Sequence, residues 1–315
     1  MDNTTTLSFS RRFTLDNLGI RGQVVRLDNV WREIMLGRDY PADVTRYFGE
    51  LACVAVMVGT GLKHAGRITL QIQGAPQNLS TTSSMGGAGA TGVTSSTAAT
   101  NTTNRAARLV VLDCTDQLGL RGMASSVSDS LENESVGFSD WVGKGTLAMT
   151  VSNSDSGQQY QSIVPISGLS VAECFEHYFD QSEQLPTHLW LTANAHGAGA
   201  LMLQKLPDAD QRDADGWARV EMLASSVTEG ELIATPVDVL LQRLFSQEDV
   251  RLYSPTGVHS ACVRDEEKVR DVLRSLGREE LDATIAEYGE VIVKDDMCNQ
   301  EYRFDGKAIA ALFEK

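Results

Sequence analysis

The sequence predicts an α+β protein with an N-terminal sheet-and-helix domain, a helical linker and a small C-terminal α/β domain. Three observations predict this organisation. Apolar residues follow both helical and strand spacing within the first part of the chain. Residues 207–216 become acidic and rich in turn formers, which is typical of a domain boundary. The last part of the chain has a helix, helix, strand pattern of its own. We therefore divide the chain into 1–205, 206–255 and 256–315.

The N-terminal domain begins with a predicted buried helix, because apolar residues between 44 and 62 recur at steps of four and three. Residues 67–73 then alternate apolar and polar side chains, which predicts a half-buried strand. Ser170 and Glu173 match a capping box, which predicts a helix that ends before Pro186. The strand criteria also predict strands at 108–112, 146–151, 160–166, 188–192 and 200–205.

An uncharged stretch interrupts this domain. Residues 80–104 are mostly Ser, Thr, Gly, Ala and Asn, with almost no large apolar side chain. Such a segment buries too little surface to offset an ordering cost of ~1–2 kcal/mol per residue for the backbone. We expect a disordered, low-complexity insertion in a loop.

The linker and the C-terminal domain are predicted mainly as helices. Two amphipathic stretches follow the boundary, one around Trp217 and one that opens with Pro236, and we expect them to lie on the N-terminal domain as detachable helices. Helices at 266–276 and 278–288 come next, followed by a strand at 290–293, a turn and a short terminal helix. So small a domain is marginal without a metal, a disulfide or docking to a neighbour.

Composition excludes several classes of partner. The chain has 315 residues, of which 42% are hydrophobic, and its net charge is −15. Nucleic-acid binding depends on basic surface, so this balance argues against DNA or RNA as the main partner, and against a polybasic membrane contact. The longest apolar run, residues 51–58, is far shorter than the ~20 residues that cross a bilayer.

The cysteines and the N-terminus indicate a cytoplasmic protein. Five cysteines are an odd number spread along a chain of ordinary size, unlike the disulfide framework of a small secreted protein. The first residues lack the apolar segment of a secretion signal, and Asp2 and Asp16 argue against a mitochondrial transit peptide. Cys53 and Cys174 fall on apolar helix faces, where thiols are usually inert, and we assign Cys114 no role.

Catalytic motifs are absent, with one cluster of potential ligands as the exception. There is no Walker A loop, no zincin motif and no nucleophile elbow. Residues 143–148 carry the letters of a dinucleotide fingerprint, but a strand pattern follows them where a helix is needed. His259 and Cys262, with Asp295, Asp296 and Cys298, form two short clusters that resemble a zinc site in layout. With only two thiols, the residues alone favour two isolated cysteines.

Eight segments point to one protein family. They are Gly19–Gly22, Arg38–Pro41, Leu62–Gly74, Leu120–Gly122, Gly143–Leu147, Tyr160–Val164, Tyr178–Thr187 and Ile285–Glu290. Together they resemble the redox-regulated heat-shock chaperones of thirty-three kilodaltons over nearly the whole chain, and the segment ending at Thr187 is the most specific. Residues 80–104 look like an insertion relative to that family.

The resemblance implies a stress-response holdase and no enzyme. Members of that family hold zinc through four cysteines when reduced. Oxidation forms disulfides and releases the metal, after which the C-terminal domain and the linker unfold. The apolar surface exposed on the linker and the N-terminal domain then binds unfolding client proteins without ATP, usually as a homodimer, and aids their refolding. The C-terminal domain is therefore expected to be a zinc-binding-like redox domain.

This chain departs from the family pattern because it keeps two of the four thiols, Cys262 and Cys298. Three outcomes are open. Zinc is bound by both thiols with His259 and Asp295 or Asp296; the domain folds without metal and responds through one Cys262–Cys298 disulfide; or the switch is lost and temperature governs binding. We favour the second and third together. The alternative function, from another class, is a metal-dependent hydrolase that uses the same Cys/His/Asp cluster.

Overall fold

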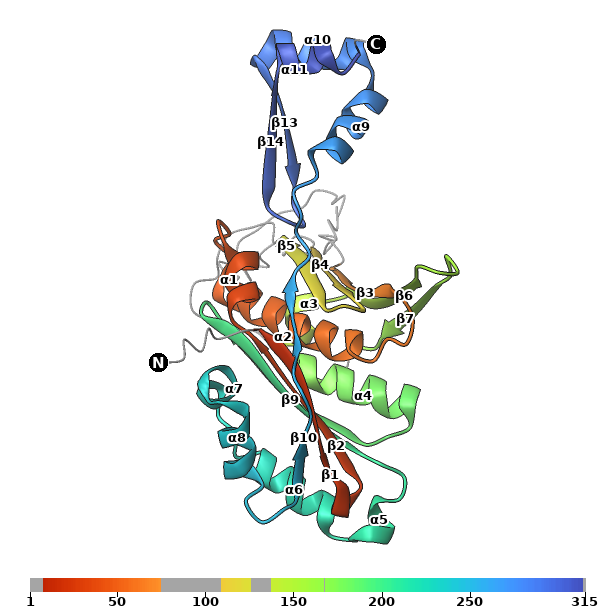
Figure 1. Cartoon of the computed structure of the whole chain (residues 1–315), viewed down its shortest axis with the longest axis vertical. Coiled ribbons are helices and arrows are strands. Elements are labelled where there is room, and N and C mark those ends of the chain that lie inside the picture. Colours follow the sequence, from red (N-terminus) through yellow and green to blue (C-terminus); the bar gives the residue numbers. More distant parts are fainter. Residues whose placement is uncertain (1–7, 75–108, 126–136, 167, 314–315) are drawn as a thin grey trace, which may run out of the picture.

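The computed structural model describes residues 8–74, 109–125, 137–166 and 168–313. Within these residues the chain forms two six-stranded sheets, a two-stranded sheet and the helices that cover them (Figure 1). The predicted α+β class is confirmed. The predicted insertion at 80–104 lies outside the described residues.

The first sheet has the strand order β10-β1-β2-β9-β8, with β11 also paired to β1, and all of its pairs are antiparallel. Its central strand β2 is buried at nearly every residue because helices cover both faces of the sheet. The strands are β1 (Phe9–Leu15), β2 (Ile20–Leu27), β8 (Thr187–Asn194), β9 (Gly197–Lys205), β10 (Val250–Leu252) and β11 (Thr256–Gly257).

The second sheet has the order β12-β5-β4-β3-β6-β7, in which only the β12–β5 pair is parallel. The predicted alternation of residues 67–73 is confirmed, since Ile68, Leu70 and Ile72 are buried in β3. The strand pattern predicted after the glycines of 143–145 is confirmed, since β6 follows them. The strands are β3 (Gly66–Gln73), β4 (Leu109–Thr115), β5 (Gly119–Ser125), β6 (Thr146–Asn153), β7 (Gln159–Val164) and β12 (His259–Ser260).

The long helix α2 lies between the two sheets and forms the centre of the main core. It begins after Pro41, and the close approach of Gly49 to Trp31 and Ala193 leaves no room for a side chain there. Although α2 is largely apolar, none of the helices within the described residues has the length and apolar character needed to span a membrane. The helices of this domain are η1 (Asp16–Leu18), α1 (Asn29–Met35), α2 (Ala42–Gly59), α3 (Phe138–Val142) and α4 (Val171–Glu183).

The predicted cap of α4 is only half right. The Ser170 hydroxyl accepts a hydrogen bond from the Glu173 N–H at 3.1 Å, as expected. The Glu173 carboxylate, however, accepts from the N–H of Leu169, one residue before the cap. The helix still begins at its predicted position, because the serine satisfies one of the free N–H groups of its first turn, that of Glu173.

The linker helices lie on the face of the first sheet that α2 does not cover, and they form a second core with it. Both predicted amphipathic stretches are helical, and α8 starts directly after Pro236. A further short helix, α7, begins with a capping box formed by Thr228 and Glu231. The helices are α5 (Ala209–Arg212), α6 (Gly216–Ala224), α7 (Glu229–Ala234) and α8 (Val237–Leu244).

The end of the chain, residues 265–313, forms a C-terminal unit with a core of its own (Figure 1). Both predicted helices have the expected bounds, and the predicted strand and turn belong to a β-hairpin. The elements are α9 (Glu266–Leu276), α10 (Arg278–Tyr288), β13 (Glu290–Asp295), β14 (Gln300–Asp305) and α11 (Gly306–Ala311). Its buried core consists of seven side chains: Leu273, Leu281, Val291, Tyr302, Phe304, Ile309 and Leu312.

Candidate functional site

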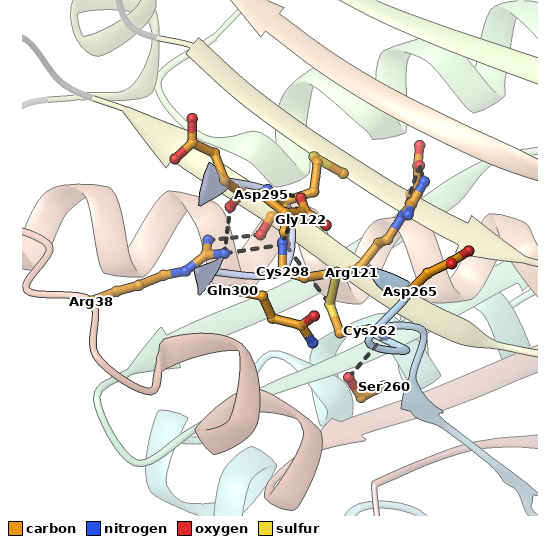
Figure 2. The surroundings of a disulfide bond; sticks show 12 residues. Arg38, Arg121, Gly122, Ser260, Cys262, Asp265, Asp295, Cys298 and Gln300 are labelled. Carbon is orange, nitrogen blue, oxygen red and sulfur yellow. Dashed lines mark hydrogen bonds and ion pairs between the residues drawn. A yellow bond between two sulfur atoms is a disulfide. The ribbon is translucent and has the colours of Figure 1, made fainter. Parts of the chain in front are cut away.

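A disulfide joins the two cysteines that the sequence singled out (Figure 2). Cys262 follows β12 and Cys298 lies in the turn of the β13–β14 hairpin, 36 residues later, with 5.3 Å between their Cα atoms. The bond therefore ties the end of the segment that runs along the N-terminal sheets to the C-terminal hairpin. Cys262 is placed by the pairing of β12 with β5, and Cys298 by the tight turn of the hairpin.

The remaining candidate ligands serve other interactions. The Asp295 carboxylate accepts hydrogen bonds from the N–H groups of Met297 and Cys298, at 3.0 and 3.3 Å, and so shapes the turn. Asp296 pairs with Lys294 at 3.6 Å. His259 lies in β12, where its ring packs against Gly119 of β5.

This arrangement does not fit a zinc site. Zinc in structural sites is held by four convergent ligands, and cysteine binds it as a thiolate, which a sulfur in a disulfide is not. Among the described residues, no group of three or more His, Cys, Asp or Glu side chains is placed to hold a metal. The structure brings Cys262, Cys298 and Asp295 together in one turn region without making them a ligand set.

We therefore expect freshly reduced protein, prepared without chelator, to carry well below one zinc per chain. Two thiols supply only half of a tetrahedral site, and carboxylates are rarer partners in structural sites. Metal analysis by mass spectrometry checks this expectation. About one zinc per chain, lost on Cys262→Ser but retained on Cys174→Ser, would contradict it.

Arg38 docks the hairpin turn on the N-terminal domain (Figure 2). Its guanidinium donates to the carbonyls of Asp296 and Met297, at 2.7 and 3.1 Å, and to the carbonyl of Gly122 in β5 at 2.7 Å. Asn299 adds a hydrogen bond to the Leu36 carbonyl. The role of Arg38 could not be predicted from the sequence, because an arginine that binds main-chain carbonyls leaves no pattern of paired residue types.

The linker helices cover an apolar surface of the first sheet. The N-terminal domain contributes seven buried side chains to this second core, namely Phe13, Leu15, Leu18, Ile20, Val24, Leu201 and Leu203. The linker contributes eight, namely Val220, Ala224, Leu232, Val237, Leu240, Leu241, Leu244 and Phe245. If the linker left the sheet, both sets would become exposed and form an apolar patch of the kind that binds other proteins.

A buried arginine fixes α7 to the sheet. Arg26 of β2 is 3% exposed, and its guanidinium donates to the carbonyls of Leu232 and Thr235 at the C-terminal end of α7. Burial lowers the pKa of Arg26, while the nearby charge of Asp28 opposes that shift. A cation at a helix C-terminus is also favoured by the helix dipole.

His188 of β8 connects α4 to the linker. Its Nε2 lies 3.2 Å from the Glu221 carboxylate of α6, and its Nδ1 lies 3.6 Å from that of Glu176 in α4. The ring also stacks on Trp217 of α6, with 5.6 Å between centroids. Hydrogen bonding with Glu176, together with the charges of Glu176 and Glu221, raises the pKa of His188, although burial opposes the shift.

Docking of α6 should weaken as the pH rises above neutrality. A raised folded-state pKa means that the stabilisation is complete below the ordinary histidine pKa of ~6.5 and is lost as pH passes through the folded value. Because His188 is 36% exposed, the effect should be at most about 1 kcal/mol. Tryptophan fluorescence between pH 5 and 9 should follow it. His188→Gln should remove the dependence, whereas His196→Gln, on an exposed turn, should retain it.

Comparisons with known proteins agree over almost the whole chain. The family model described as Hsp33 protein matches residues 9–88 and 79–305. The chain is 34% identical to the 33 kDa chaperonin of Methylobacillus flagellatus over 306 residues, which cover 96% of this chain and 93% of that protein. It is 32% identical to the 33 kDa chaperonin of Nitrosococcus oceani, with 96% and 93% covered. The crystal structure of the Hsp33 homologue of Thermotoga maritima matches with a TM-score of 0.70, at 20% identity and 97% coverage of both chains, which shows the shared fold.

Proposed function

Because this chain belongs to the Hsp33 protein family and is a chaperone, we propose that it binds unfolding client proteins without ATP, as a holdase. One observation carries the proposal. The second core consists of apolar side chains shared between the first sheet and short linker helices. These helices are amphipathic and cannot form a core by themselves, so their release would expose both halves of that surface.

We propose that the C-terminal unit controls this release. Its seven-residue core is too small to give much stability alone. The Cys262–Cys298 bond and the Arg38 hydrogen bonds hold it against the N-terminal domain. Loss of these restraints would free the chain between the linker helices and Cys262.

The effect of oxidation that we propose is opposite to the effect that the family resemblance implies. There, oxidation removes zinc and unfolds the domain. With two thiols and no fitting zinc site, disulfide formation would instead stabilise the unit, and reduction would loosen it. In the reducing cytoplasm that we propose for this protein, the thiol form would prevail and temperature would govern client binding.

Light scattering of a thermally aggregating client enzyme tests the holdase proposal. We expect suppression at near-equimolar ratio without nucleotide, and stronger suppression by the reduced protein than by the oxidised one. The metal-dependent hydrolase gains no support from family membership. The holdase proposal fails if neither redox form suppresses aggregation. The proposed homodimer of the active form can be checked in the same samples by analytical ultracentrifugation.

A further inference from the structure

A single stretch of chain covers one edge of each large sheet. Residues 250–261, which we call the covering segment, run from the end of the linker to Cys262 (Figure 1). Its strands β10 and β11 pair with the edge of β1 in the first sheet, and β12 pairs with the edge of β5 in the second. The covering segment is therefore the outermost strand of both sheets.

The coverage of β1 extends over its whole length. Leu15 lies opposite Val250, and Phe9 lies opposite Gly257. Between and beyond these pairs, Tyr253 donates its N–H to the Arg12 carbonyl at 3.0 Å, and Val258 donates to the Ser8 carbonyl at 2.9 Å. Removal of the covering segment would leave a seven-residue strand, Phe9–Leu15, with an unpaired main-chain edge, and such an edge is a template for another strand.

The covering segment is held by few apolar side chains, besides the Arg251–Asp16 ion pair and the hydrogen bond from Arg11 to the Tyr253 carbonyl. Val250 and Leu252 pack at the margin of the second core, and Val258 is buried in the main core. Tyr253 is 44% exposed and lies at an open cavity of about 830 Å³ between the two sheets. The edge therefore accommodates apolar side chains two residues apart, as at Val250 and Leu252, and an aromatic side chain next to them at the cavity.

We propose that the β1 edge is a docking site for an extended segment of an unfolded client, which replaces the covering segment by strand addition. The inference rests on the proposed holdase function and specifies the client feature that is recognised. Main-chain hydrogen bonds supply affinity without regard to sequence, and alternate apolar side chains supply preference. Folded proteins lack such a free segment, so the edge selects unfolded chains. While the covering segment is paired with β1, it competes with clients for this edge. Its effective concentration is high because it belongs to the same chain.

A peptide that copies residues 249–258 tests the docking site directly. Its binding to full-length protein is measured by fluorescence anisotropy, with a second peptide N-methylated at the positions of Tyr253 and Val258 as control. Leu252→Asp with Val258→Asp should expel the covering segment and raise peptide affinity by about tenfold or more. Val239→Asp with Val263→Asp, at exposed positions, should leave the affinity unchanged. The inference is overturned if the variant with Leu252→Asp and Val258→Asp binds both peptides equally or binds neither.

Hydrogen exchange on the unaltered protein provides a second measurement that does not depend on these variants. Under conditions that activate the holdase, those amides of residues 9–15 that face the covering segment should exchange faster, and a bound client should protect them again. Client binding without that protection would overturn the edge inference while the holdase function stands. Loss of all aggregation suppression, with peptide binding to the edge intact, would refute the holdase proposal alone.

Discussion

Replacing Cys298 with serine should destabilise the C-terminal unit by about 4 kcal/mol, the amount expected for a cross-link that spans 36 residues. A single small core of this size seldom supplies more than ~3–5 kcal/mol. The variant should therefore have a largely unfolded C-terminal unit near 37 °C, and it should suppress client aggregation without any reductant. Hydrogen exchange in residues 266–311 and limited proteolysis would report the unfolding.

A double-mutant comparison controls this prediction. Cys262→Ser should have the same effect as Cys298→Ser, and the double variant should be no less stable than either, because all three remove one bond. Treatment of the unaltered protein with dithiothreitol should reproduce the result. Additive losses in the double variant, or a C-terminal unit as stable in the single variants as in the oxidised protein, would show that the bond does not hold the unit.

Arg26→Met should release α7 and cost about 2–4 kcal/mol, because the buried carbonyls of Leu232 and Thr235 would lose their donor. Methionine fills a similar volume, so the change removes hydrogen bonds more than packing. We expect faster hydrogen exchange in residues 229–235 and client binding in the oxidised protein, where the disulfide is intact.

Two further substitutions make the Arg26 prediction specific. Arg26→Lys keeps the charge with fewer directed donors, so it should retain part of the docking. Arg32→Met, at an exposed arginine of α1, should change stability by less than about 0.5 kcal/mol. If Arg26→Met leaves the exchange of α7 and the oxidised holdase activity unchanged, the arginine does not anchor the linker.

The sequence predicts those parts of the fold in which local pattern and final environment agree. The helix α2, the strand β3 and the two helices of the C-terminal unit have strong periodicity and clear end signals. The strand β2 had no such signal, because it is covered on both faces and does not alternate. The strands β10, β11 and β12 have two or three residues each and exist only through their pairing with β1 and β5.

Only those residues of the candidate site whose type alone indicates a reaction, the two cysteines, could be predicted from the sequence. The pairing of Cys262 with Cys298 was one of three alternatives that followed from the family resemblance. Arg26, Arg38 and His188 were missed, because their partners are carbonyls and carboxylates from segments distant in sequence. No spacing rule connects such groups, and only the assembled sheets bring them together.

The positions of the five cysteines allow the redox state and the folding of the protein to be read from its chemical modification. Cys53, Cys114 and Cys174 are buried outside the disulfide, and burial raises the pKa values of the Cys53 and Cys114 thiols. A maleimide should therefore modify no site in the folded oxidised protein, two sites after reduction, and five only after the reduced protein is globally denatured. Intact-mass spectrometry would then count oxidised, reduced and globally unfolded molecules in one sample, without a fluorophore or an engineered label.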